Sequence, residues 1–194
     1  MCSWCWAFES TRKQLFEQLD DNIEIVRLLG GLAPDSDEPM PKQMQEFLQN
    51  TWRKIEQQVP GTRFNFDFWQ QCKPRRSTYP SNRAVIAARF QGVKFDELMT
   101  HRIQQAYYTE AKNPSDNETL ISLASDLGLD DNKFEQDLLS EQVNDTLMKE
   151  ISDSRKLGLN SFPSLAVISQ GRLTHINLDY NNVEPMLSQI NALD

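Results

Sequence analysis

The chain has 194 residues, of which 39% are hydrophobic and 25% charged, so it is long enough to bury a core of its own. Its 20 Lys and Arg against 28 Asp and Glu give a net charge of −8, which argues against partners such as nucleic acid or an anionic membrane surface. No apolar stretch approaches the roughly 18–20 residues of a membrane-spanning helix, and no basic and then apolar leader opens the chain. Its 3 cysteines exclude a small scaffold held by several disulfides.

The first predicted element is a helix over residues 6–19, because its apolar positions recur at helical spacing. Cys2 and Cys5 stand where this helix begins. Residues 23–29 are rich in β-branched side chains and end at Gly30-Gly31, which predicts a strand.

The middle of the chain is predicted to be nearly all helix, and its end to be a hairpin followed by a helix. The helical patterns cover residues 44–55, 84–88, 95–106, 115–127 and 132–157, the fourth opened by a capping box of Ser115 and Glu118. Residues 164–169 and 172–178 flank Gln170-Gly171 and predict a β-hairpin, and residues 183–193 predict a last helix. We expect the strand at 23–29 and this hairpin to share one sheet, with the helices between them inserted.

The Cys2-Ser3-Trp4-Cys5 motif has the spacing of a redox pair at a helix N-terminus. Unpaired backbone N–H groups there favour a thiolate at Cys2, which can form a mixed disulfide that Cys5 then resolves. A structural zinc site uses the same spacing, but it needs about four ligands and the chain has no second such motif. The other alternative to a redox pair is that both cysteines are buried core residues without a chemical role.

A second motif supports the redox interpretation. In Ser161-Phe162-Pro163-Ser164-Leu165, a proline stands at the first position of the predicted hairpin strand. A proline there, with a cis Phe162–Pro163 bond, leaves the preceding backbone free to pair with an extended peptide. Together with MCSWCWAF and RRSTYPSNRAVIAAR, this segment resembles the DsbA family of the thioredoxin superfamily, in its FrnE-like branch, over essentially the whole chain.

The resemblance implies roles for residues at matching positions. Cys2 corresponds to the nucleophile, Cys5 to the resolving cysteine and Pro163 to the cis-proline beside the sulfurs. It further implies a substrate-binding surface that includes Ser3 and Trp4, with Phe162 supplying backbone contacts. The same surface would include Trp6 and Phe8, although Phe8 is more simply a core residue of the first helix.

The predicted fold class is α/β, a thioredoxin-like fold with a large all-helical insertion. Residues 1–40 and 158–194 would form the discontinuous thioredoxin-like domain, and residues 41–157 the inserted helical domain. The family's fold has a strand directly before the cysteine motif, whereas here only Met1 precedes Cys2. We therefore expect this first strand to be missing from the sequence, because the chain either starts at an internal methionine or is a fragment; the alternative is that another segment takes the place of the strand.

The function that follows is thiol–disulfide exchange with protein or small-molecule thiols, in a direction that the residues leave open. The resemblance implies no bound cofactor or metal, with glutathione as a conceivable co-substrate, and a cytoplasmic location. Kappa-type glutathione transferases and 2-hydroxychromene-2-carboxylate isomerases are similar in architecture, but they typically carry a serine in place of the nucleophilic thiol and lack the second one. A non-enzymatic peptide-binding module is the third hypothesis.

The other chemistry-bearing residues have simpler interpretations. Cys72 is expected to be an isolated thiol. Arg75, Arg76 and Arg83 form the one basic cluster and are expected to make ion pairs with nearby acidic helices. His101 and His175 are expected at the surface.

Overall fold

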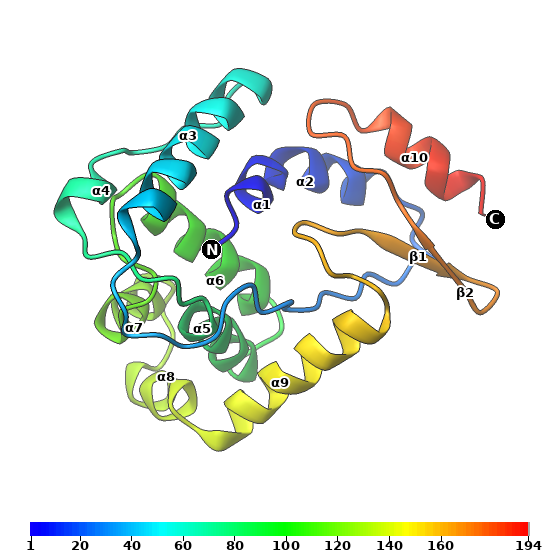
Figure 1. The fold of residues 1–194 in the computed structure, drawn as a ribbon. Coiled ribbons are helices and arrows are strands. Elements are labelled where there is room, and N and C mark those ends of the chain that lie inside the picture. Colours follow the sequence, from blue (N-terminus) through cyan, green and yellow to red (C-terminus); the bar gives the residue numbers. More distant parts are fainter. Residues whose placement is uncertain (194) are drawn as a thin grey trace.

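The computed structural model describes residues 1–193. Two short helices open the chain, and a long loop leads from them into a block of seven helices, which is followed by a hairpin and a last helix (Figure 1). The helices are α1 (Ser3–Ala7), α2 (Glu9–Glu17), α3 (Lys42–Gln58), α4 (Phe68–Gln71), α5 (Tyr79–Phe90), α6 (Phe95–Tyr108), α7 (Asn117–Asp126), α8 (Asp131–Leu138), α9 (Glu141–Lys156) and α10 (Glu184–Asn191). The strands are β1 (Ala166–Ser169) and β2 (Arg172–His175).

The hairpin is confirmed, with shorter strands than predicted. β1 and β2 pair in an antiparallel register that sets Ala166 opposite His175 and Ser169 opposite Arg172. The turn residues Gln170 and Gly171 have φ values of 50° and 78°. Two positive φ angles are the mark of a type I′ turn, whose twist matches that of the flanking strands.

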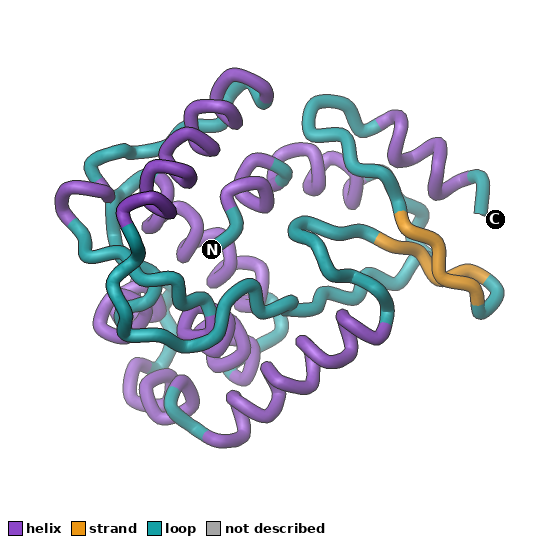
Figure 2. Tube along the Cα trace, viewed as in Figure 1, coloured by secondary structure: helices purple, strands orange, loops and turns teal. Residues whose placement is uncertain are grey.

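The predicted strand over residues 23–29 is wrong. This segment follows α2 as a loop that crosses the molecule before reaching α3 (Figure 2). Its β-branched residues have a local preference for extended backbone, but a strand also needs a neighbour for its N–H and C=O groups. Within residues 1–193 the sheet consists of β1 and β2 alone. The prediction that residues 23–29 join the hairpin in one sheet is therefore also wrong.

Several helix boundaries differ from the predictions. The first helix is divided at Phe8 into α1 and α2. The last part of the helical block is divided into α8 and α9, because the Ser140 hydroxyl caps the new helix by accepting the Val143 N–H at 3.2 Å. The predicted capping box is wrong: Asp116 is the N-cap of α7, while Ser115 donates its hydroxyl to the Ser77 carbonyl at 2.7 Å.

The buried side chains form three clusters. One lies among α5, α6, α7, α8 and α9, and includes the fully buried Phe134 and Leu147. The second is aromatic and centres on Trp52 of α3, which stacks on Phe64 with 4.9 Å between ring centroids. The third joins α2, the hairpin and α10 through Leu15, Ile176 and others. The cysteine motif therefore lies on a helix held from both sides, by the aromatic cluster and by the hairpin cluster.

Candidate active site

Cys2 is the N-cap residue of α1. Its backbone is extended, with φ −104° and ψ 115°, and its sulfur accepts the Cys5 N–H at 3.2 Å. A side chain at this position satisfies one of the N–H groups that a helix start leaves unpaired. The motif thus forms its own cap, and the sulfur of Cys2 takes the place usually held by a serine or aspartate oxygen.

The two thiols of the motif differ in acidity. A hydrogen bond from the Cys5 side chain lowers the pKa of Cys2 below the usual value of 9.0, against the opposing effect of burial. The same interaction, with burial, raises the pKa of Cys5 well above 9.0. Both cysteines are free and half-buried. Because the thiolate is the reactive form of cysteine, this difference makes Cys2 the candidate nucleophile of the pair.

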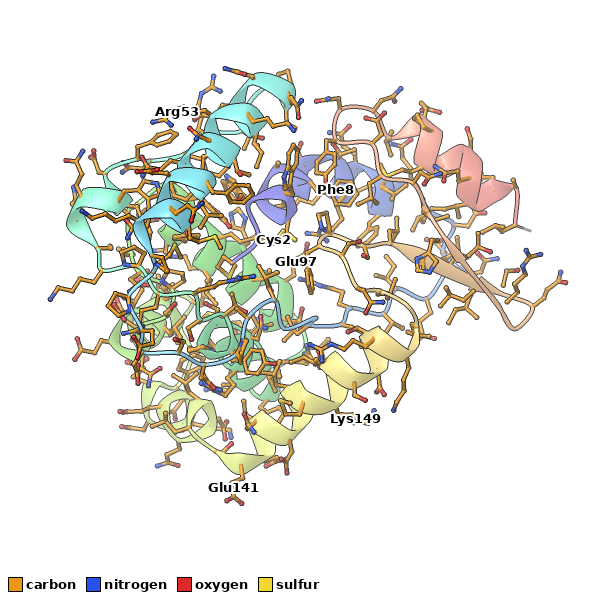
Figure 3. All side chains as sticks on the ribbon, viewed as in Figure 1. Cys2, Phe8, Arg53, Glu97, Glu141 and Lys149 are labelled. Carbon is orange, nitrogen blue, oxygen red and sulfur yellow. The ribbon has the colours of Figure 1, made fainter. Side chains whose placement is uncertain are left out.

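The loop between α9 and β1 approaches Cys2 directly. As a thiol, Cys2 donates to the Phe162 carbonyl oxygen at 3.5 Å, and the Phe162–Pro163 peptide is cis, as predicted. Figure 3 labels Cys2 at the start of α1, near the tip of this loop. Residues separated by 160 positions in the chain therefore meet at one sulfur.

Gly30 makes room for the ring of Phe162. A Cβ atom built on Gly30 would lie 2.1 Å from Cε1 and 2.8 Å from Cζ of Phe162, far closer than atoms can approach. The backbone of the 23–30 segment therefore packs against the residue that contacts Cys2. In the sequence, Gly30-Gly31 indicated only the end of a predicted strand, and nothing there indicated this contact with Phe162.

Two open cavities meet at Cys2. The first, here called the α3 groove, has a volume of about 460 Å³ and lies between α1 and α3, lined by Ser3, Trp4, Phe47 and Lys54 among others. The second, here called the hairpin groove, has a volume of about 340 Å³ and is bounded by residues 26–32 on one side and 161–166 on the other. Cys5, Phe162 and Pro163 line the hairpin groove with Cys2.

The aromatic residues of the motif take different positions. Trp4 is half-buried beside Cys2 in the α3 groove and meets the ring of Tyr180 edge-on at 5.0 Å. Trp6 lines neither groove: it stacks on Tyr108 at 5.8 Å, and its indole N–H donates to the Arg63 carbonyl. Phe8 is buried, as expected for a core residue, and it also lines the hairpin groove.

The remaining candidates lie away from the two sulfurs. Cys72 donates its thiol to the Ala111 carbonyl at 3.0 Å, and burial raises its pKa. Arg75 pairs with Asp116 at 2.6 Å and Arg83 with Asp35 at 2.8 Å, as expected, whereas the exposed Arg76 makes no ion pair with any described residue. Residues 1–193 contain no group of three or more His, Cys, Asp or Glu side chains placed to hold a metal ion.

Sequence reasoning missed one charged group at the site. The Glu9 side chain lines the hairpin groove and lies 2.6 Å from Nδ1 of His101, a residue 92 positions later. A glutamate four residues after Cys5 is a visible pattern, since such a spacing places two side chains on one helix face. Its partner on α6 could not be found from the sequence alone.

A helix-capping dithiol beside a cis-proline loop is the site architecture of the thioredoxin fold. The family model described as Thioredoxin matches residues 1–187, and the chain belongs to this family. This confirms the resemblance to the DsbA-like members of the thioredoxin superfamily.

Two solved structures share the fold. A protein from Nitrosomonas europaea, provisionally described as a protein disulfide isomerase, is 21% identical with a TM-score of 0.84, and the match covers 99% of this chain and 92% of that one. The cytosolic disulfide reductase DsbM from Pseudomonas aeruginosa is 20% identical with a TM-score of 0.76 over 99% and 93% of the two chains. DsbM has also been solved with GSH.

Relatives described as adapters are also found. The ClpXP adapter protein SpxH of Halalkalibacterium halodurans is 26% identical over 168 residues, which are 84% of this chain and 54% of that protein. The chain spans about half the length of the curated relatives it matches. Among the described residues, no helix is both long and apolar enough to cross a bilayer.

Proposed function

We propose that this chain catalyses thiol–disulfide exchange through Cys2 and Cys5. The observation that carries the proposal is the geometry at Cys2, whose sulfur accepts the Cys5 N–H at 3.2 Å and lies 3.5 Å from the carbonyl oxygen of Phe162, the residue before cis-Pro163. In reduction, the Cys2 thiolate attacks one sulfur of a substrate disulfide, and the other substrate sulfur leaves with the electron pair. Cys5 then attacks Cys2, releases the first substrate sulfur and leaves a Cys2–Cys5 disulfide.

The loop that carries Phe162 and Pro163 is proposed to hold the substrate backbone. The Phe162 carbonyl already lies 3.5 Å from the Cys2 sulfur, and both residues line the hairpin groove. An extended peptide that pairs with this loop would bring its own disulfide to Cys2. Ser3 and Trp4 are proposed to contact the substrate from the α3 groove. Trp6 lies outside both grooves, and we propose that it stabilises α1 by stacking on Tyr108.

Reduction is the proposed direction, with glutathione as a co-substrate that regenerates the dithiol. The DsbM structures support this choice, since that protein is described as a cytosolic disulfide reductase and one of its structures contains GSH. We propose a cytoplasmic location on the same ground, because glutathione keeps thiols reduced there. Residues 41–157 are proposed to be an inserted helical domain, supported by the separate core that α5–α9 form.

The test is insulin reduction in the presence of dithiothreitol. We expect the wild-type chain to accelerate the reaction and Cys2→Ser to lose that acceleration. Cys72→Ser is the matched control, because Cys72 lines neither groove, and it should keep the wild-type rate. A Cys2→Ser variant as active as wild type would eliminate the redox mechanism.

A peptide-binding adapter is the second candidate function, and the match to SpxH favours it. An adapter needs a groove but no thiol chemistry. It would bind its partner with equal affinity in the wild-type chain and in the Cys2→Ser, Cys5→Ser double variant. A loss of binding in the double variant would favour the redox function instead.

A further inference from the structure

Tyr108 carries a buried hydroxyl that the exchange chemistry described above does not use. The residue ends α6, and its side chain is fully buried. Within residues 1–193 its hydroxyl makes no hydrogen bond of normal geometry, and a buried polar group without a partner costs free energy. A phenylalanine would avoid this cost, and the same aromatic cluster already contains Phe64 and Phe68. A role other than packing is therefore expected of this hydroxyl.

The cysteine motif lies against this tyrosine. The Tyr108 ring stacks on the indole of Trp6, with 5.8 Å between the ring centroids and 22° between the ring planes. The side chain of Ser3, which stands between the two cysteines, faces the Tyr108 hydroxyl and is itself buried. A small rotation of the Ser3 side chain completes a hydrogen bond between the two hydroxyl groups. Tyr108 is thus placed to hold the motif through Ser3.

The surroundings of Tyr108 keep its phenol protonated. Burial raises the pKa of Tyr108 well above 10.0. Negative charge on Tyr107 or on either sulfur of the motif raises this pKa further, and a hydrogen bond with Ser3 acts against these effects. The phenol is therefore neutral at neutral pH, and its O–H can donate to the Ser3 hydroxyl oxygen. Because the charges of both sulfurs reach the phenol, the phenol can affect the thiol chemistry in return.

The position of Tyr108 is fixed by its neighbours in the aromatic cluster. Its ring meets Trp52 edge-on at 5.7 Å and Phe64 edge-on at 5.3 Å. Its carbonyl oxygen accepts the Asn65 N–H at 2.6 Å. A side chain that is packed on several sides has few alternative positions of its own. It can therefore hold a neighbouring group in one place.

The first turn of α1 needs such support. A helix of 5 residues is not stable by itself, so its geometry depends on tertiary contacts. The pKa of Cys2 is lowered by a hydrogen bond from the Cys5 thiol and further by the backbone N–H groups of Cys5 and Trp4. Ser3 connects Cys2 to these two N–H groups. A rotation of the Ser3 backbone would turn them away from the sulfur and weaken the stabilisation of the thiolate.

We propose that Tyr108 is a positioning residue for Cys2. Its hydroxyl holds Ser3 and thereby keeps the N–H groups of the first turn directed at the Cys2 sulfur. This inference rests on the proposed thiol–disulfide exchange and deepens it. The Cys2 thiolate exists in the dithiol form and is absent from the Cys2–Cys5 disulfide, so the contact stabilises the reduced protein relative to the oxidised one. Tyr108 therefore contributes to the redox potential of the pair.

The experiment compares Tyr108→Phe with the parent chain, both in a Cys72→Ser background. The rate at which iodoacetamide labels Cys2 in the reduced protein, measured over a range of pH by peptide mass spectrometry, gives the pKa of Cys2. We expect Tyr108→Phe to raise this pKa. The labelling rate at a fixed pH below the pKa should then fall about three- to tenfold, because a smaller fraction of Cys2 is thiolate.

Equilibration with glutathione tests the consequence for the redox potential. One molecule of oxidised glutathione converts the dithiol to the Cys2–Cys5 disulfide and becomes two molecules of reduced glutathione. We expect Tyr108→Phe to shift this equilibrium toward the protein disulfide, since the thiolate of the dithiol form has lost stabilisation. At a pH above the pKa of Cys2 the equilibrium constant should change by about the same three- to tenfold factor.

Two variants control this result. Tyr107→Phe removes the neighbouring buried hydroxyl, whose pKa is raised by burial and by the charge of Cys72, and it should leave both measurements unchanged. Ser3→Ala removes the group through which Tyr108 acts, so it should raise the pKa of Cys2 as well. Adding Tyr108→Phe to Ser3→Ala should cause no further rise. Should Tyr108→Phe fail to fold, Ser3→Ala decides alone, and an unchanged pKa of Cys2 would then overturn the proposal.

Three outcomes contradict different claims. An unchanged pKa of Cys2 in Tyr108→Phe would overturn the positioning role, and if the same variant unfolds more easily in urea, its hydroxyl only supports the structure. An equal rise of the Cys2 pKa in Tyr107→Phe would also overturn the role of Tyr108. A parent chain that forms no Cys2–Cys5 disulfide at any glutathione ratio would instead refute the proposed function.

Discussion

Replacing Gly30 by alanine would put a methyl group where the Phe162 ring now lies. The added Cβ would meet Cε1 at 2.1 Å, whereas ordinary contacts begin at 3.4 Å, so the ring must move by about 1.3 Å. Forcing an extra methyl into packed space typically costs about 1–3 kcal/mol. Because Phe162 is half-buried, the loop that carries it can shift toward solvent, and we expect a cost of about 1 kcal/mol in the free energy of unfolding.

The effect on turnover should exceed the effect on stability. The Phe162 carbonyl lies 3.5 Å from the Cys2 sulfur, and displacing the ring displaces this backbone. A misplacement of about 1 Å at a reacting centre can reduce a rate about 10²-fold. We therefore expect Gly30→Ala to reduce insulin turnover by about ten- to a hundredfold. Alkylation of Cys2 should stay within about twofold of wild type, because the Cys5 N–H that contacts its sulfur is untouched.

A double-mutant cycle tests the cause. Phe162→Ala removes the obstructing ring, so the unfolding cost of Gly30→Ala should vanish in the Phe162→Ala background. Urea denaturation of the four proteins measures this coupling. The reasoning is refuted if the cost of Gly30→Ala is the same in both backgrounds, or if Gly30→Ala turns over insulin at the wild-type rate.

Two further predictions concern reactivity and stability. Iodoacetamide at neutral pH should label Cys2 well before Cys72, because the pKa of Cys2 is lowered and that of Cys72 is raised; peptide mass spectrometry gives the order, and preferential labelling of Cys72 would contradict it. Glu150 accepts the Leu29 N–H at 2.9 Å and forms an ion pair with Arg89. Glu150→Gln should therefore lower the free energy of unfolding, measured by urea denaturation, by about 1–3 kcal/mol. An unchanged free energy of unfolding would show that these two contacts do not stabilise the fold.

The features predicted correctly depend on short stretches of sequence. Cys2 caps α1 because a polar atom at that position can reach the N–H of Cys5 within one turn. The turn at Gln170-Gly171 follows from two residues that tolerate positive φ between strand-forming segments. In each case the residues that decide the structure are near neighbours, so no tertiary contact was needed to predict it.

The features missed depend on distant residues. Whether residues 23–29 form a strand depends on a partner strand, which local propensity cannot supply. Ser115 is a good capping residue, but its hydroxyl donates instead to the carbonyl oxygen of Ser77, 38 positions earlier. Gly30 and Glu9 likewise gain their importance from Phe162 and His101, which only the folded chain brings beside them.

Equilibration of the protein with defined ratios of reduced to oxidised glutathione tests the central claim most directly. Trapping the thiols and measuring the mass of the intact chain gives the fraction that holds a disulfide at each ratio. The account predicts one two-electron transition from a dithiol to a Cys2–Cys5 disulfide, unchanged by Cys72→Ser and abolished by Cys5→Ser. If the chain stays fully reduced at every ratio, or forms a disulfide that needs Cys72, the account is wrong.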